Sequence, residues 1–358
     1  MKIVSFFSGA GGLDRGFELA KFNVIWANEY DKLIGKTYQR NFPDTKFDSR
    51  SISDIPPEDI PKCDGIIGGP PCQSWSEAGM LRGADDQRGQ LFFKYVDLIA
   101  VKRPLFFLAE NVSGITLTRN KAALNRILQK FSKIGYNVSY QLLNANDYGV
   151  PQDRERLIIV GYLAQYGKHF VPPEPESYRP TLKDAIWDLR KTAVPAADKN
   201  KRNTKVKKAN HEYMTGGFSS IFMSRNRVRP WNLPSFTIQA SGRHAPIHPQ
   251  APKMVPIKKD VHVFKDKGNY RRLSVRECAR IQTFRDSHRF LYDNVADGYK
   301  MVGNAVPVNF ATALARTIMS DVSKFNKSKR EEHVRGTVKA GNLKRSRQPR
   351  SAMQGDLD

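Results

Sequence analysis

The chain has 358 residues, 40 % of them hydrophobic, which is enough for one large domain plus a smaller one with a sizeable core. This composition excludes a disordered chain, and no apolar run approaches the ~20 residues that a membrane-spanning helix needs. Three cysteines are too few, and odd in number, for a disulfide framework, and no Cys/His spacing predicts a metal site. We expect a cytoplasmic protein, because the N-terminus lacks the cleavage pattern of a signal peptide.

Basic residues outnumber acidic ones, with 59 Lys and Arg against 35 Asp and Glu, and the net charge is +24. The segment from Asp321 to Asp358 has ten Lys/Arg and five Asp/Glu, or +5, so the remaining +19 belongs to the folded body. A protein this basic usually faces a polyanion, and DNA or RNA is the leading candidate.

Short apolar runs alternate along the chain with segments whose apolar residues have helical spacing. The expected strands are residues 2–7, 23–27, 65–69, 105–109 and 157–160. The expected helices are residues 13–20, 92–102, 121–134, 275–284 and 308–322. This alternation predicts an α/β fold with a doubly wound, mostly parallel sheet. Residues from about 176 to 270 are irregular and rich in Pro, Asn, Arg and Lys, which predicts a smaller second domain with contacting loops.

The first strand runs into the turn Ser8-Gly9-Ala10-Gly11-Gly12. Glycines let a backbone approach a ligand closely, and the N-terminus of the following helix favours polar or anionic groups. Asp14 stands where the dinucleotide fingerprint has its third glycine, which weakens the nicotinamide oxidoreductase that Gly9-x-Gly11 alone suggests. Glu29, at the end of the next strand, can accept hydrogen bonds from ribose hydroxyls. A tight strand–helix turn without a ligand is the alternative.

Cys72 follows Gly68-Gly69-Pro70-Pro71, just past the carboxyl end of a predicted strand, where open α/β sheets bind their ligands. The prolines stiffen the backbone before it, and a thiol needs nearby cations to ionise at neutral pH. This setting favours a nucleophile, whereas Cys63 and Cys278 are interpreted as buried structural cysteines.

Two further polar groups border predicted strands. Glu110 directly follows an apolar strand and can transfer protons in the same cleft if its pKa is raised, although an ordinary helix-cap acid is the alternative. Arg154 and Arg156 alternate at a strand edge, so both guanidiniums are expected on one side, where they suit a phosphate and a base carbonyl oxygen. A solvated charged edge is the alternative for this pair.

Arginine-bearing loops mark the expected small domain. Its candidate DNA-contacting residues are Arg225, Arg227, Arg229 and Arg243. Arginine pairs bidentately with guanine in the major groove, so the dominance of arginine predicts a G-rich site.

From residue 2 to about 320 the chain resembles the cytosine-5 DNA methyltransferases, because many separate motifs agree in order and spacing. These are Phe7-Ser8-Gly9-Ala10-Gly11-Gly12, Gly69-Pro70-Pro71-Cys72-Gln73, Glu110-Asn111-Val112, Gln152-x-Arg154-x-Arg156, the stretch from Arg272 to Gln282, and Gly303-Asn304-Ala305-Val306-Pro307. Residues 142–152 and 213–252 are similar to the bacterial restriction–modification enzymes that modify GGCC, which implies methylation at the inner cytosine of GGCC.

The resemblance implies a Rossmann-like, S-adenosylmethionine-dependent enzyme acting on double-stranded DNA. It implies that Cys72 adds to carbon-6 of a flipped-out cytosine and that Glu110 bonds to ring nitrogen-3 and the exocyclic amine. Arg154 and Arg156 would hold the carbonyl oxygen and a nearby phosphate, and Ile221 would fill the space that the base leaves. The residues implied to hold the cofactor are Phe7, Ser8, Gly9, Ala10, Gly11, Gly12, Leu13, Glu29, Tyr30, Ser51, Ile52, Pro70, Leu91, Asn304 and Val306.

The sequence departs from the family in three positions. Ser51 stands where the family has an Asp that accepts from the adenine amine, which puts cofactor affinity in doubt unless Asp48 or Asp54 substitutes for it. Phe284-Arg285 replaces Phe-Pro, and His244 lies in a stretch that differs from the GGCC subgroup.

The resemblance also implies a domain plan. The catalytic domain would comprise residues 1–175 and 286–322, the target-recognition domain residues 176–285, and a basic, disordered tail residues 323–358. The segment with Arg276, Arg280 and Gln282 would brace the small domain. A monomer is implied, working alongside a cognate restriction endonuclease, with no metal and no membrane. The alternatives are the same chemistry on tRNA, or a DNA-binding relative that has lost activity.

Overall fold

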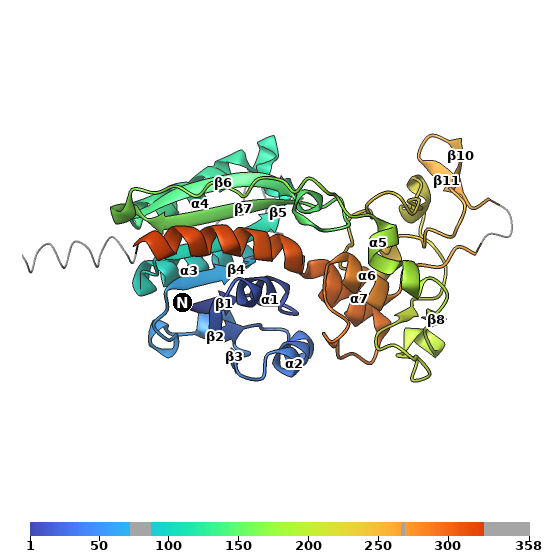
Figure 1. Cartoon of the computed structure of the whole chain (residues 1–358), viewed down its shortest axis with the longest axis horizontal. Helices are drawn as coiled ribbons and strands as arrows, with labels where there is room; N and C mark the ends of the chain where they lie inside the picture. The colour runs from blue at the N-terminus through green and yellow to red at the C-terminus, as the bar shows by residue number, and fades with distance from the viewer. Residues whose placement is uncertain (72–86, 266–268, 326–358) are drawn as a thin grey trace, which may run out of the picture.

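The computed structural model describes residues 1–71, 87–265 and 269–325 (Figure 1). Its centre is a seven-stranded sheet in the order β3-β2-β1-β4-β5-β7-β6. Strands β3, β2, β1, β4 and β5 pair in parallel, whereas β7 is antiparallel to both β5 and β6. The strands are β1 (Lys2–Phe6), β2 (Asn23–Asn28), β3 (Lys46–Asp48), β4 (Gly65–Gly68), β5 (Phe106–Val112), β6 (Tyr136–Asn144) and β7 (Glu155–Leu163). The predicted doubly wound, mostly parallel sheet is confirmed, and β3 and β6 are strands that the sequence pattern did not reveal.

Helices cover both faces of this sheet, which is why its central strands are almost entirely apolar. One face packs against α1 (Gly12–Leu19) and the helix at residues 308–325. The other face packs against α3 (Gln87–Lys102) and α4 (Lys121–Lys133). Helix α2 (Lys32–Asn41) lies beside β2 and β3 and begins at Asp31, whose carboxylate accepts from two backbone N–H groups of its first turn.

The smaller domain lies to one side of the sheet and has little regular structure (Figure 1). It contains α5 (Leu182–Ile186), α6 (Val275–Ile281), the short strand pair β8 (Val194–Pro195) and β9 (Glu212–Tyr213), and the hairpin of β10 (Val255–Lys258) and β11 (Val261–Val263). Helix α6 ends earlier than predicted, because Thr283 has a positive φ of 60° that breaks the helix.

Two helices bear on the predicted domain boundaries. Helix α7 (Val295–Asn304) packs with α6 in a cluster that also includes Ala10 and Ile34, and the helix that covers the sheet begins at residue 308. The last helix continues past residue 322 to 325, where the buried Phe325 ring stacks on Tyr166 with centroids 4.2 Å apart. Residues 323–325 therefore belong to the folded body, and the rest of the predicted tail lies outside the described residues.

A buried ionic network holds the start of α6. Arg271 donates from both terminal nitrogens to the carboxylate of Glu277, each at 2.7 Å, and Glu277 has no solvent exposure. Burial raises the pKa of Glu277, but the hydrogen bonds and charge of Arg271 outweigh it, and the net shift is downward. Arg276 is equally buried and donates to the carbonyls of Ala209 and His288, as a bracing residue should.

We expect Arg271→Leu to lower the free energy of unfolding by about 3–5 kcal/mol, because it leaves the Glu277 carboxylate buried without a counter-charge. The pair's contribution is present above the pKa of an unfolded glutamate and is lost as the pH falls through the depressed pKa of Glu277. Urea denaturation at neutral and acidic pH measures both effects. The matched control is Arg179→Leu, which removes an exposed arginine paired with Asp147 and should cost under about 1 kcal/mol. Equal losses in the two variants would contradict the expectation.

Candidate active site

The glycine turn after β1 is tightly packed and adopts backbone conformations that favour glycine. Gly9 and Gly11 have positive φ values of 55° and 84°, and a Cβ on Gly11 would collide with the ring of Phe42. The Gly9 N–H donates to the Glu29 carboxylate at 3.0 Å, and the Asp31 N–H donates to its other oxygen at 2.9 Å. Burial raises the pKa of Glu29, although these two hydrogen bonds oppose the shift. The turn and the acid predicted from the sequence are thus joined into one cradle.

Asp14 explains why the third fingerprint glycine is missing. Its fully buried carboxyl group accepts from the Ser5 hydroxyl at 2.7 Å and the Tyr38 hydroxyl at 2.6 Å. Burial raises the pKa of Asp14 to about 6. The carboxyl group therefore ties α1 to β1 and α2 beneath the turn, where a dinucleotide-binding protein would have a glycine.

The remaining residues predicted to bind cofactor surround this cradle unevenly. Tyr30, next to Glu29, is exposed, the Val306 carbonyl lies against Gly12, and Asn304, two residues before Val306, is exposed at the end of α7. Leu91 belongs to α3 and packs, partly buried, against the core between that helix and the sheet. Ser51 caps a short 3-10 helix by accepting from the Ser53 N–H at 3.3 Å.

The two acids near Ser51, Asp48 and Asp54, differ in whether they already have an ion-pair partner among the described residues. Asp48 is engaged by Arg50, with the closest nitrogen–oxygen distance 2.6 Å. Asp54 is exposed. Of the two carboxylates considered as substitutes for the missing family Asp, Asp48 already has a partner.

A carboxylate and a guanidinium meet at the carboxyl end of β5. Arg156 Nε lies 2.9 Å from Glu110 Oε1, and both side chains are nearly buried. Burial lowers the pKa of Arg156, and the neighbouring Glu110 acts in the opposite direction. Antiparallel pairing of β5 with β7 sets Arg156 opposite Val112, close enough to reach Glu110.

The same strand end holds the segment that leads into Cys72. Asn111 Nδ2 donates to the Pro70 carbonyl at 2.9 Å, and a Cβ on Gly69 would lie 3.3 Å from a Glu110 carboxylate oxygen. Cys72 itself lies outside the described residues. The chain therefore reaches Pro71 directly beside the Glu110–Arg156 pair.

The expectation that Arg154 and Arg156 point into one cleft is wrong. Arg154 precedes β7, is only 1 % exposed, and donates to three backbone carbonyl oxygens, each at 3.0 Å. These carbonyls belong to Ile238, Gly303 and Ala305. Period-two alternation applies only inside a strand, and Arg154 lies outside it, so its guanidinium turns into the junction between the domains.

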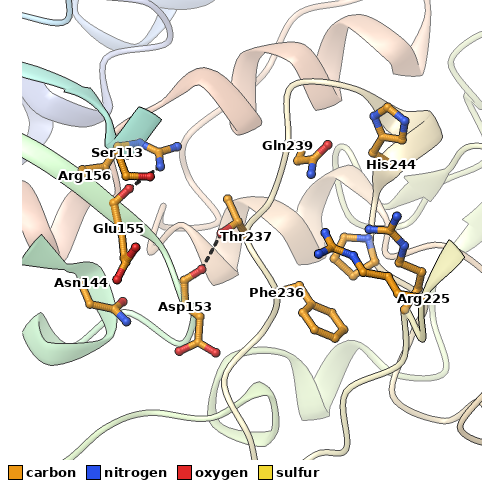
Figure 2. Close-up of a pocket in the computed structure, with 12 residues that line it drawn as sticks. Ser113, Asn144, Asp153, Glu155, Arg156, Arg225, Phe236, Thr237, Gln239 and His244 are labelled. Atoms are coloured by element: carbon orange, nitrogen blue, oxygen red, sulfur yellow. Dashed lines mark hydrogen bonds between the residues drawn. The ribbon is translucent and has the colours of Figure 1, made fainter. Parts of the chain in front are cut away.

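A hollow of about 470 Å³ lies between the ends of β6 and β7 and the small domain (Figure 2). Figure 2 shows Arg156, Glu155 and Asn144 on one wall and Gln239, His244 and Arg225 on the other. The sequence pattern missed Gln239, His244 and Phe236 as lining residues, because their positions depend on how an irregular loop is folded. Such a hollow, with basic and amide groups facing it, can hold a nucleic acid base and its phosphates.

The predicted DNA-contacting arginines differ in their surroundings. Arg225 is exposed at the hollow. Arg227 instead donates to the carbonyls of Phe222 and Ile221, at 2.8 and 2.9 Å, and so braces the loop that presents Ile221, which is 71 % exposed. Arg229 pairs with Asp153 at 2.9 Å. Arg243 lines a separate hollow beside Gly216 and Gly217.

The described residues contain neither a metal-binding cluster nor a membrane-spanning helix. In residues 1–71, 87–265 and 269–325, no group of three or more His, Cys, Asp or Glu could hold a metal ion. In the same ranges, no helix has both the length and the apolar character required to span a bilayer.

Comparison with known proteins shows the family of this chain. Residues 1–320 match the model of the C-5 cytosine-specific DNA methylases, and the chain belongs to this family of DNA (cytosine-5-)-methyltransferases. The chain is 53 % identical over 337 residues to the Type II methyltransferase M.FnuDI of Fusobacterium nucleatum, covering 92 % of this chain and 98 % of the relative. It is 51 % identical over 325 residues to the Type II methyltransferase M.NgoPII of Neisseria gonorrhoeae, covering 89 % and 95 %.

Solved structures share the fold at low sequence identity. The methyltransferase EhMeth of Entamoeba histolytica matches with a TM-score of 0.66 and 17 % identity over 90 % of this chain and 98 % of that one. DNMT2 of Spodoptera frugiperda matches with a TM-score of 0.65 and 16 % identity over 89 % and 99 %. Family and fold together imply S-adenosylmethionine as the methyl donor and DNA as the substrate.

Proposed function

We propose that this enzyme is the methyltransferase of a Type II restriction–modification system and methylates carbon-5 of the inner cytosine in GGCC. The observation that carries the chemistry is the Glu110–Arg156 pair beside the Gly69–Pro71 segment that leads into Cys72. The system is supported by the names of relatives about half identical over nearly the whole chain. The target is supported by the resemblance of residues 142–152 and 213–252 to GGCC-modifying enzymes.

In this mechanism the thiolate of Cys72 adds to carbon-6 of the cytosine, and the electron pair of the 5,6 double bond makes carbon-5 nucleophilic. Glu110 holds a proton or hydrogen bond at ring nitrogen-3, which stabilises the charge that addition places on the ring. Arg156 keeps the Glu110 carboxyl group oriented and offers its other donors to the base carbonyl oxygen. Once carbon-5 carries the methyl group that the bound cofactor would supply, loss of the carbon-5 proton to a base and cleavage of the carbon–sulfur bond restore the aromatic ring and the thiolate.

The cradle of Gly9, Gly11 and Glu29 fits the nucleoside part of S-adenosylmethionine. The positive φ values and the Phe42 ring against Gly11 keep side chains off this turn, which supports a close approach of a ligand to its backbone, and the Glu29 carboxylate can accept from ribose hydroxyls. When bound, this cofactor supplies the electrophilic methyl group. Tyr30 follows Glu29 directly and the Val306 carbonyl lies against Gly12, so both suit contacts with the same cofactor, whereas Ser51 offers a hydroxyl where the family has an Asp.

The target cytosine must leave the duplex to reach this site, at a cost of roughly a few kcal/mol in unstacking and unpairing. Ile221 is suited to fill the vacated space, because it is a large apolar side chain held exposed on a loop braced by Arg227. Arg225, facing the hollow, is the arginine best placed to contact DNA there.

The test is bisulfite sequencing of plasmid DNA after incubation with the purified protein and S-adenosylmethionine, alongside Cys72→Ala. We expect methylation at the inner cytosine of GGCC with the natural chain, and none with the variant because it has no thiol to add to carbon-6. Cys63→Ala is the matched control, since burial raises the pKa of that thiol to about 12 and makes it a poor nucleophile. Methylation at another motif would overturn the GGCC target, and methylation that survives Cys72→Ala would overturn the nucleophile.

A further inference from the structure

The β10–β11 hairpin is attached directly to the wall of the hollow that faces the active site. The Met254 N–H, just before β10, donates to the Asn226 side chain at 3.1 Å, and the Arg227 N–H donates to the Met254 sulfur at 3.3 Å. Arg225 and Arg227 line the hollow on either side of Asn226. The base of the hairpin is therefore fixed to the segment that faces the substrate.

Aromatic contacts fix the other strand of the hairpin. Phe264, which follows β11, lies 4.9 Å from Phe218 and 4.2 Å from Tyr270, measured between ring centroids. Phe218 in turn contacts Phe222, in the loop that presents Ile221. The hairpin is thus a rigid extension of the same loop and wall, and Figure 1 shows it standing out from the small domain.

The hairpin is strongly basic, and its first strand, β10, is exposed along its whole length. Lys253, Lys258, Lys259 and Lys265 are all exposed, and Asp260 is the only acid between residues 253 and 265. Within the described residues none of these lysines has an ion-pair partner, whereas Lys208 and Lys300 of the same domain are both paired. Every residue of β10 is exposed, so this strand contributes little to the core of the small domain.

We propose that the β10–β11 hairpin is a docking arm for the phosphate backbone of the DNA duplex that flanks the target sequence. This inference rests on the proposed function, because it takes the duplex to enter the hollow at Arg225. The four residues of β10 span roughly 13 Å at ~3.3 Å per residue, and Met254 fixes their first end at the wall, so Lys258 and Lys259 lie at the far end of the strand from Arg225. Unpaired lysines suit phosphates, which carry no sequence information, so the arm adds affinity without adding specificity.

The experiment compares Lys258→Ala/Lys259→Ala with the natural chain on two duplexes that contain one GGCC site. One duplex is about 12 base pairs long and lacks flanks for the arm, and the other is about 30 base pairs long. We expect the double variant to bind the long duplex about tenfold more weakly and the short duplex with unchanged affinity. The salt dependence of log K on the long duplex should decrease in slope by about 2, because two phosphate contacts are lost at ~0.9 each.

Lys21→Ala/Lys46→Ala is the matched control, since it removes the same charge from two exposed lysines outside the small domain, one in the turn before β2 and one in the edge strand β3. A loss of the same size in this control would show a general charge effect and overturn the proposal. Equal weakening on both duplexes, or no weakening on either, would also overturn it. Lys258→Arg/Lys259→Arg should restore affinity for the long duplex, and failure to do so would count against phosphate contacts.

Failure of the proposed function gives a different result. A natural chain that binds the long duplex more tightly than the short one, and loses this difference with the double variant, supports the arm even if no GGCC site is methylated. If the natural chain methylates GGCC but binds both duplexes with equal affinity, the proposed docking arm is overturned and the proposed function stands.

Discussion

Glu110→Gln lowers the rate of methyl transfer by on the order of 10²–10⁴-fold, whereas the protein folds and binds DNA as before. Glutamine keeps the shape of the side chain that meets Arg156 at 2.9 Å, but it cannot hold a transferable proton at ring nitrogen-3 of the cytosine. The charge that develops when Cys72 adds would then be left without its acid. Single-turnover transfer of a labelled methyl group to a GGCC duplex measures the effect, because it isolates chemistry from product release.

Glu58→Gln is the control for this prediction, because Glu58 is exposed in a short 3-10 helix and bonded to no other side chain among the described residues. It should methylate at the rate of the natural chain. If Glu110→Gln also keeps a rate within about threefold of that value, Glu110 is a structural partner of Arg156 and takes no part in proton transfer.

Arg154→Met lowers the free energy of unfolding by about 3–5 kcal/mol, because three buried carbonyl oxygens lose their charged donor. Those carbonyls lie in the small-domain loop at Ile238 and at the end of α7, where the chain is about to return to the sheet. The side chain therefore joins the two domains, and methionine fills its volume without replacing its hydrogen bonds. Urea denaturation followed by circular dichroism measures the loss.

The same variant separates a positioning role from a catalytic one. The measurement is made at a low temperature, where Arg154→Met remains folded. We expect the KM for DNA to rise, because the small domain is less firmly held. We expect kcat to fall by a smaller factor than it does in Glu110→Gln. Arg229→Met is the matched control, since Arg229 is 25 % exposed, pairs with Asp153 across the domain boundary and lies over the Phe236 ring. A stability loss equal in the two variants would show that the three carbonyl contacts of Arg154 carry no special weight.

Local sequence patterns predicted the parts of the site that depend on strand ends and backbone conformation. The turn could be recognised because glycine is favoured at positive φ and because Gly11 has no room for a side chain beside Phe42. Glu29 could be recognised because it directly follows β2. Glu110 could be recognised because it comes after the apolar residues of β5, near the carboxyl end of that strand, although the strand itself continues to Val112. The roles proposed for Cys72 and the cofactor residues remain predictions, to be decided by the experiments above.

The sequence by itself determined the fold class, the order of the motifs and the family, because each of these depends on the spacing of residues along the chain, which can be read directly from the sequence. Only the tertiary structure decided what each arginine does. Arg156 meets an acid of a neighbouring strand, whereas Arg154 and Arg227 donate to backbone carbonyls, and Arg225 is exposed at the hollow with no ion-pair partner in the described part of the chain. The reason is physical: a guanidinium goes where unpaired acceptors are, and those acceptors are brought together from segments far apart in the chain.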